Sequence, residues 1–106
     1  RAATFTVIDA VAVTAGTPAT VWTPASGKTV RLLGWALCST AGEALEFQDS
    51  GTPGTVIAQT PLLAAAGLHT SLDIGEGVVL AAAENTLKLD VTATSTVSGM
   101  VFGVEE

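Results

Sequence analysis

The sequence predicts an all-β protein, an antiparallel β-sandwich for which the eight-stranded jelly roll with an extended N-terminal arm is the favoured architecture. The 106 residues include 16 Thr, 12 Val and 3 Ile, and β-branched side chains favour strands. Turn signals recur roughly every 8–12 residues without intervening helices, a spacing typical of sandwiches. The alanine runs 64–66 and 81–83 are too short for helices. An immunoglobulin-like sandwich is the main alternative.

The strand assignment rests on alternation of apolar and polar residues. In the clearest case, Leu87, Leu89 and Val91 share one face, opposite Lys88 and Asp90. The strands that we expect, in chain order, are residues 4–13, 20–23, 28–38, 44–49, 55–59, 69–74, 77–82, 86–92 and 97–104, separated by turns rich in Gly, Pro, Asn and Ser. We assign residues 1–19 to an N-terminal arm or first strand and residues 20–106 to the sandwich, since the length allows one core.

Two of these strands are expected to be apolar on both faces. In the first, Leu33, Trp35 and Leu37 alternate with Val30, Leu32, Ala36 and Cys38; in the second, Val97 and Val101 oppose Met100, Phe102 and Val104. A sandwich buries one face of each sheet, so we expect another subunit to cover the second face. The candidate subunit interface is Trp35, Leu37, Met100 and Phe102. Loops or the N-terminal arm of the same chain are the alternative cover.

Charge and composition exclude several classes of function. The chain has ten Asp and Glu residues and four Lys and Arg residues, which gives a net charge of −6. It therefore lacks a basic surface for nucleic acid. The longest apolar run, Val78–Ala83, is far shorter than the ~20 residues of a membrane span. Cys38 is the single cysteine, which excludes an intrachain disulfide and a cysteine-rich zinc site, and its apolar neighbours predict that it is buried.

Polar clusters give weak signals for chemistry. His69, Ser71 and Asp73 alternate on a predicted strand, but residues two apart are separated by roughly 6.5–7 Å, too far for a nucleophilic relay. We therefore interpret them as the solvent face of that strand. The acidic residues Glu43, Glu46 and Asp49 are expected at the surface, with Glu46 pointing opposite to the other two. Asp73 and Glu76 lack calcium-loop spacing. No catalytic residue, metal or cofactor is expected, and the protein is predicted not to be an enzyme.

The two tryptophans are expected to differ. Trp35 lies in the most apolar strand and is predicted to be buried. Trp22 precedes Thr23 and Pro24 at a strand end, which makes it the better candidate for contact with a partner or a sugar. Local core packing is the alternative for Trp22.

From Lys28 onward, the order of features resembles that of small virion proteins of tailed bacteriophages, of the capsid decoration or cement type. The matching segments are GKTVRLLGW (27–35), EFQDSG (46–51), GEG (75–77), NTLKL (85–89) and ATSTVSGMV (93–101). The final segments are also similar to the last strands of trimeric jelly rolls of the tumour-necrosis-factor type. Hydrophobic spacing and glycines carry both resemblances.

The resemblance implies a structural function in the virion. Trimers of such proteins sit on the outer capsid surface at three-fold positions and clamp neighbouring subunits of the major capsid protein. The N-terminal stretch lies outside the resemblance, and we expect Phe5, Val7 and Ile8, with Trp22, to form the capsid interface. A receptor- or carbohydrate-binding jelly-roll module of a phage fibre or adhesin is the alternative. Neither function involves nucleic acid or a membrane.

Overall fold

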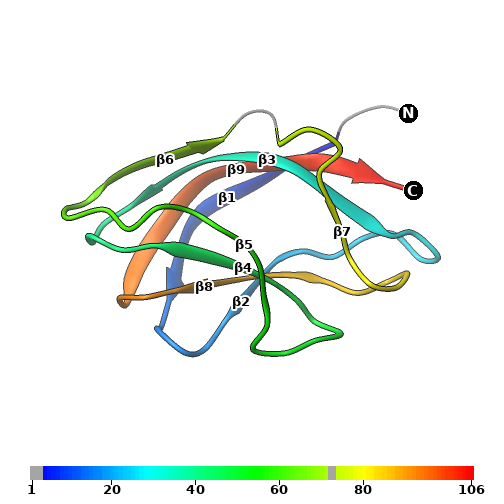
Figure 1. The fold of residues 1–106 in the computed structure, drawn as a ribbon, viewed down its shortest axis with the longest axis horizontal. Coiled ribbons are helices and arrows are strands. Elements are labelled where there is room, and N and C mark those ends of the chain that lie inside the picture. Colours follow the sequence, from blue (N-terminus) through cyan, green and yellow to red (C-terminus); the bar gives the residue numbers. More distant parts are fainter. Residues whose placement is uncertain (1–3, 72–73) are drawn as a thin grey trace.

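In a computed structural model that describes residues 4–71 and 74–106, two antiparallel sheets pack face to face as a β-sandwich, and the described residues contain no helix (Figure 1). The strands are β1 (Thr4–Val13), β2 (Ala19–Trp22), β3 (Val30–Ser39), β4 (Leu45–Asp49), β5 (Val56–Gln59), β6 (Gly67–Ser71), β7 (Val78–Val79), β8 (Leu87–Val91) and β9 (Ser95–Glu105). Each overlaps a segment predicted from the sequence, and the bounds agree within two residues except at the C-terminal ends of β6 and β7, which come three residues earlier than predicted. The predicted all-β sandwich is confirmed.

The order of the strands gives the sandwich two different edges. One sheet has the order β1-β9-β3-β6, with the short β7 also paired to β3, and the other has the order β2-β8-β4-β5. A short turn links the edge strands β1 and β2, and we call this side the β1/β2 edge. On the opposite side, a longer segment links β5 to β6, and we call it the β5/β6 edge. Residues 4–13 are thus the first strand, paired antiparallel with β9.

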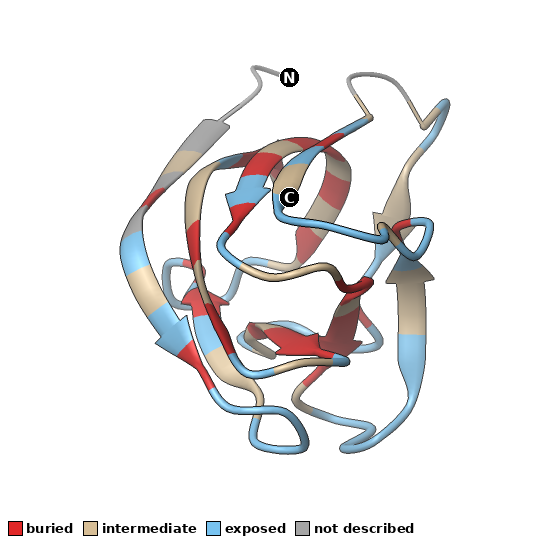
Figure 2. Ribbon diagram, turned by 90° about the vertical axis from the view of Figure 1, so that its left-hand side faces the viewer, coloured by how far each residue is buried: buried red, intermediate tan, exposed pale blue. Residues whose placement is uncertain are grey.

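The core lies between the two sheets (Figure 2). Leu87, Leu89 and Val91 of β8 are at most 2% exposed, as their alternation predicts. The ring of Phe47 on β4 meets that of Trp35 on β3, with centroids 4.9 Å apart and planes tilted by 37°. Such an aromatic contact adds about 0.5–1.5 kcal/mol to the burial of the two rings. The sheets are therefore joined by apolar packing across the interface.

A β-bulge changes the predicted faces of β3. The register with β9 shifts between Leu32 and Gly34, and the extra residue reverses the alternation of side chains. Val30, Leu32, Trp35 and Leu37 consequently all point into the core, with exposures of 0–6%. The prediction that Trp35 and Leu37 face away from Val30 and Leu32 was wrong. A Cβ on Gly34 would lie 2.5 Å from the Ser71 carbonyl oxygen, so the bulge also requires glycine there.

The bulge exposes Cys38 on the far side of the five-stranded sheet, which we call the outer face. Cys38 pairs with Leu68 on β6 and Ser98 on β9, and paired residues point to the same face. The thiol is exposed, so the prediction of a buried Cys38 was wrong. Its sequence neighbours Trp35 and Leu37 point into the core, and Cys38 therefore points to the opposite face of the strand.

Candidate binding cleft

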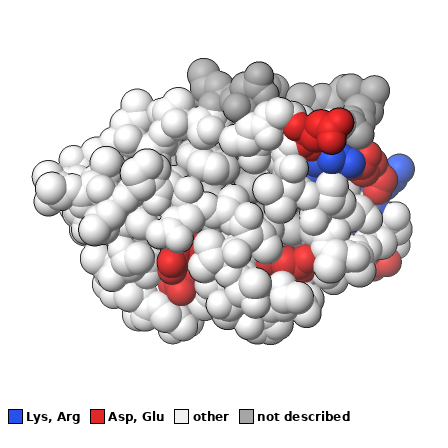
Figure 3. Space-filling model, viewed as in Figure 1, with Lys and Arg blue, Asp and Glu red and all other residues white. Residues whose placement is uncertain are grey.

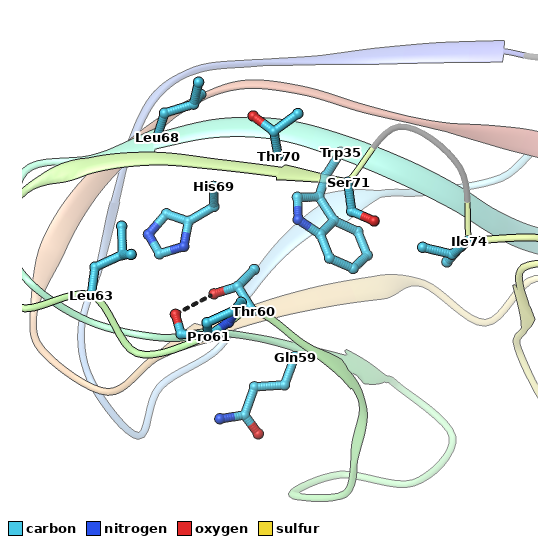
Figure 4. Close-up of a pocket in the computed structure, with 10 residues that line it drawn as sticks. All are labelled: Trp35, Gln59, Thr60, Pro61, Leu63, Leu68, His69, Thr70, Ser71 and Ile74. Carbon is cyan, nitrogen blue, oxygen red and sulfur yellow. Dashed lines mark hydrogen bonds between the residues drawn. The ribbon is translucent and has the colours of Figure 1, made fainter.

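A cleft of about 500 Å³ opens at the β5/β6 edge, where no strand closes the gap between the two sheets (Figure 4). One wall is β6, with His69 and Ser71. The other wall is the end of β5 and the segment that follows it, with Gln59, Thr60 and Leu63. Thr60 is fixed because its hydroxyl oxygen accepts the Leu45 amide at 2.8 Å. The cleft is therefore built from two edge strands and the chain that connects them.

Trp35 lies between these walls. Its side chain is 6% exposed and packs on Phe47, so the ring is held rigidly from the core side. No hydrogen-bond acceptor for Trp35 Nε1 is found among the described residues, and the residue lines the cleft. Buried indole N–H groups usually have a partner. The Trp35 N–H is thus a donor without a partner among the described residues.

His69 is buried at 4% exposure and is oriented by a short chain of hydrogen bonds. Ser39 donates its hydroxyl proton to the Ala41 carbonyl oxygen at 2.8 Å, and its Oγ lies 3.4 Å from His69 Nε2. Since the single hydroxyl proton points to Ala41, His69 Nε2–H is the donor to Ser39. The Nδ1 atom then carries a lone pair. Burial lowers the pKa of His69, with the negative charge of Glu43 opposing this shift, so the ring is neutral near pH 7.

Glu43 is fully buried close to this group. Its Oε2 accepts a hydrogen bond from the Ser95 hydroxyl, while its Oε1 has no partner in the described part of the chain. Ser39, His69 and Glu43 nevertheless do not form a relay. The Ser39 proton is directed at a carbonyl, and the Glu43 carboxylate bonds Ser95 instead of the histidine ring.

The acidic residues around β4 correct a prediction. Glu43 and Asp49 are 0% and 3% exposed, because they share the inward phase of Leu45 and Phe47, whereas Glu46 points to the opposite face, as expected. The Asp49 carboxylate is satisfied by three donors: the Gly51 and Ala81 amides at 2.8 and 2.6 Å, and the Asn85 side chain at 2.9 Å. Asp49 thus connects the loop at Gly51 to the segment from Ala81 to Asn85. The expectation that both carboxylates lie at the surface was wrong.

The predicted faces of β6 are also reversed. His69 faces the cleft because it pairs with the inward-pointing Leu37, while Leu68 is 61% exposed on the outer face. Ser71 lines the same cleft, and Asp73 lies outside the described residues. The assumption that polar residues face solvent fails here, because the inner face of this edge strand borders a cleft rather than the closed core. The alternation itself was correct.

The candidate interface residues fall into two groups. Ile8 and Trp22 are both 3% exposed, and Trp35 and Leu37 are 6% and 0% exposed, all within the core of this chain. They offer almost no surface to a capsid or to another subunit. The Trp22 indole also donates a hydrogen bond to Glu105 Oε2 at 2.8 Å, so local packing, the alternative for this residue, describes it.

The other candidate interface residues, Met100, Phe102, Phe5 and Val7, stay predictions. Met100 is 39% exposed on the outer face, and Phe102 on the same face is partly buried, near Gly34. The side chains of Phe5 and Val7 lie outside the described part of β1.

Among the described residues, no group of three or more His, Cys, Asp or Glu side chains is placed to hold a metal ion, and no helix in that part is long and apolar enough to cross a membrane. Comparison of the chain with protein-family models, with curated proteins and with solved structures gives no match.

Proposed function

We propose that the protein is a structural component of a bacteriophage virion, a decoration or cement protein that binds the outer surface of the head as a trimer and stabilises contacts between major capsid subunits. The observation that carries the proposal is the apolar outer face of the five-stranded sheet. A surface of this kind suits lasting contact with other protein subunits. The sequence resemblance to small decoration proteins supports the same function.

The composition of the outer face supports a protein partner. Exposed apolar side chains on it are Leu68 (61%), Val79 (43%) and Met100 (39%), with Cys38 between Leu68 and Ser98 in the strand register. Arg31 lies near one end of the sheet and pairs with Glu106 at 2.5 Å. In Figure 3, which views the two sheets edge-on, most of the charged side chains in sight lie at the end of the molecule near the C-terminus, with further acidic groups on the side of the four-stranded sheet. Depletion of charge is typical of interface cores.

The strand order supports the jelly roll as the finer description of the fold. If β7 is counted as an addition, the sheets read β1-β9-β3-β6 and β2-β8-β4-β5. Eight strands folded in this way make two interlocked four-stranded sheets, the architecture of many viral capsid domains. The trimer and its position on the head are parts of the proposal that follow from the resemblance.

The test pairs native mass with capsid binding. We expect analytical ultracentrifugation to give a trimer, and co-sedimentation with expanded, undecorated phage heads to saturate at a fixed ratio to the major capsid protein. Met100→Lys should disrupt the assembly because it places a charge on the outer face. Val56→Lys is the matched control, since Val56 is 38% exposed on the opposite sheet. A monomer that ignores the heads, or equal effects of the two variants, would contradict the proposal.

A receptor- or carbohydrate-binding module of a fibre or adhesin is the second candidate. The cleft at the β5/β6 edge favours it, because small-molecule sites are concave, preformed and lined by apolar surface with a few polar groups. The predicted sugar contact at Trp22 has no exposed ring to use, so any such site is expected at Trp35.

A further inference from the structure

We propose that the cleft at the β5/β6 edge binds a neutral saccharide unit, with the Trp35 Nε1–H as a donor to a sugar oxygen and His69 Nδ1 as an acceptor from a sugar hydroxyl. The proposal deepens the second candidate function and is independent of the capsid proposal.

Two polar atoms at the cleft have no hydrogen-bond partner among the described residues. Glu43 Oε1 is the one fully buried side-chain oxygen or nitrogen without a partner among the described residues. Trp35 Nε1 and His69 Nδ1 also have no partner in that part of the chain, yet they do not belong to this buried class, so both keep contact with solvent through the cleft. Figure 4 shows the two rings as neighbours at the cleft. A ligand can therefore satisfy a donor and an acceptor that are already held in place.

The charge of the cleft walls decides which class of ligand fits. The described residues that line the cleft include no Asp, Glu, Lys or Arg, and His69 is neutral near pH 7 because its burial lowers its pKa. A charged ligand would lose its hydration without gaining an opposite charge from these lining residues. A polyhydroxylated neutral ligand fits, because each of its hydroxyls can both donate and accept.

The volume of the cleft and its mixture of apolar and polar surface also fit a saccharide unit. Trp35, Leu63 and Ile74 supply apolar surface, against which the C–H groups of a pyranose ring can pack, while Gln59 and Ser71 add polar groups at the walls. The volume of about 500 Å³ lies within the range of roughly 300–1,000 Å³ of small-molecule sites. The packing of Trp35 on Phe47 fixes the donor in advance, which reduces the entropy lost on binding.

The two tryptophans make the test internally controlled. In ¹⁵N-labelled protein, the Trp35 indole signal reports on the cleft, while the Trp22 indole is already bonded to Glu105. We expect titration with D-glucose, D-galactose, D-mannose and N-acetyl-D-glucosamine, each at millimolar concentration, to shift the Trp35 signal saturably with at least one sugar and to leave the Trp22 signal in place. Absence of a shift with all four sugars, or equal shifts of both indoles, would overturn the proposal.

Matched variants test the assigned atoms. Trp35→Phe keeps an aromatic ring but removes the N–H, and we expect about tenfold weaker binding of the sugar, the effect of one lost hydrogen bond. Trp22→Phe should leave the affinity unchanged. Gln59→Ala changes an exposed residue of the cleft wall and should also weaken binding, which keeps the test decisive if Trp35→Phe does not fold. Undiminished binding by Trp35→Phe and Gln59→Ala would refute the assignment, whatever the capsid assay gives.

Discussion

The two edges of the sandwich differ in how the chain that connects the two sheets is bonded and packed. At the β1/β2 edge, the turn is bonded to the end of the sheet: the Gly16 amide donates to Asp90 Oδ1 at 3.0 Å, and the Ala15 amide donates to Thr94 Oγ1 at 3.1 Å. At the β5/β6 edge, the connecting segment is also bonded to its own sheet, with the Thr60 amide donating to the Leu45 carbonyl oxygen at 2.9 Å and the Leu63 amide to the Glu43 carbonyl oxygen at 3.1 Å, but a cleft remains beside Trp35 and His69. The difference between the edges is this cleft, at which Trp35 Nε1 and His69 Nδ1 have no hydrogen-bond partner among the described residues.

The same residue type has opposite roles on the two sides. The Trp22 indole N–H is paired with Glu105, and that carboxylate also accepts the Ala25 amide at 3.0 Å. The Trp35 indole N–H is unpaired by the described chain. The comparison teaches that stability and binding capacity compete for the same hydrogen-bonding groups, and the following predictions test it.

The largest expected effect is the difference between two tryptophan substitutions. Trp22→Phe and Trp35→Phe remove similar volume from buried positions, but only Trp22→Phe breaks a hydrogen bond to a carboxylate. We expect Trp22→Phe to lower the free energy of unfolding by about 1–3 kcal/mol more than Trp35→Phe does. Urea denaturation of the two variants and the wild type measures this. Equal losses of stability would mean that the two edges do not differ as described.

His69 at the β5/β6 edge and Glu105, the partner of Trp22, should change the stability of the fold in different pH ranges. The pKa of His69 is lowered mainly by burial, so the unfolded chain binds a proton that the folded protein does not, and stability should fall as the pH drops below about 6.5. The pKa of Glu105 is lowered mainly by the bond from Trp22, so its contribution is present above its ordinary pKa of 4.5 and disappears as the pH falls through its lower folded value.

The measurement is the free energy of unfolding against pH for the wild type, His69→Gln and Glu105→Gln. His69→Gln should flatten the fall below pH 6.5 and leave the acid-range loss in place, and Glu105→Gln should do the reverse. A wild-type profile that His69→Gln leaves unaltered would contradict the assignment to the β5/β6 edge.

A smaller effect is expected from Glu43→Gln. The Glu43 carboxylate raises the pKa of His69 against the larger opposing effect of burial. Removing its charge should therefore lower the pKa of His69 further, and NMR titration of the imidazole protons measures the change. Glu46→Gln, on the opposite face of the same strand, is the control and should leave the histidine titration unaffected. A rise in the pKa would show that Glu43 does not act on the ring through its charge.

The smallest effect is expected at Cys38, on the outer face of the five-stranded sheet. Cys38→Ser should change the free energy of unfolding by less than about 0.5 kcal/mol, because the thiol is exposed. In the folded monomer, the Cys38 thiol should also react fully with a thiol reagent when no denaturant is present. Protection of Cys38 in the native protein, reversed by dissociation, would place the outer face inside an interface and support the proposed assembly.

Alternation and turn chemistry were sufficient to predict the strands. Leu87, Leu89 and Val91 are inside, as the period of two requires, because the strand that holds them is regular. The side-chain faces of β3 were missed because one bulge at Gly34 reverses every residue beyond it. A glycine within a strand is the one signal that pointed to such a bulge.

The candidate site was harder to predict than the fold. The cleft depends on where β6 lies relative to the segment after β5, which is a contact between distant parts of the chain. His69 and Ser71 were placed on one face correctly, but polarity suggested the wrong face. The charge of Glu43 predicts a surface position. Its spacing of two residues from the buried Leu45 instead places it on the inward face, where the structure has it.

The pairing of β1 with β9 has a consequence for the time course of folding. Residues 4–13 can complete their sheet only after residues 95–105 have left the ribosome, because those residues are their hydrogen-bonded neighbours. Until then, β1 presents an unpaired strand edge to the surrounding solution. Sheets closed by such distant segments fold slowly, over milliseconds to seconds, since long loops must form before any contact compensates for their entropy. The nascent chain is therefore most exposed to misassembly just before its last strand is made.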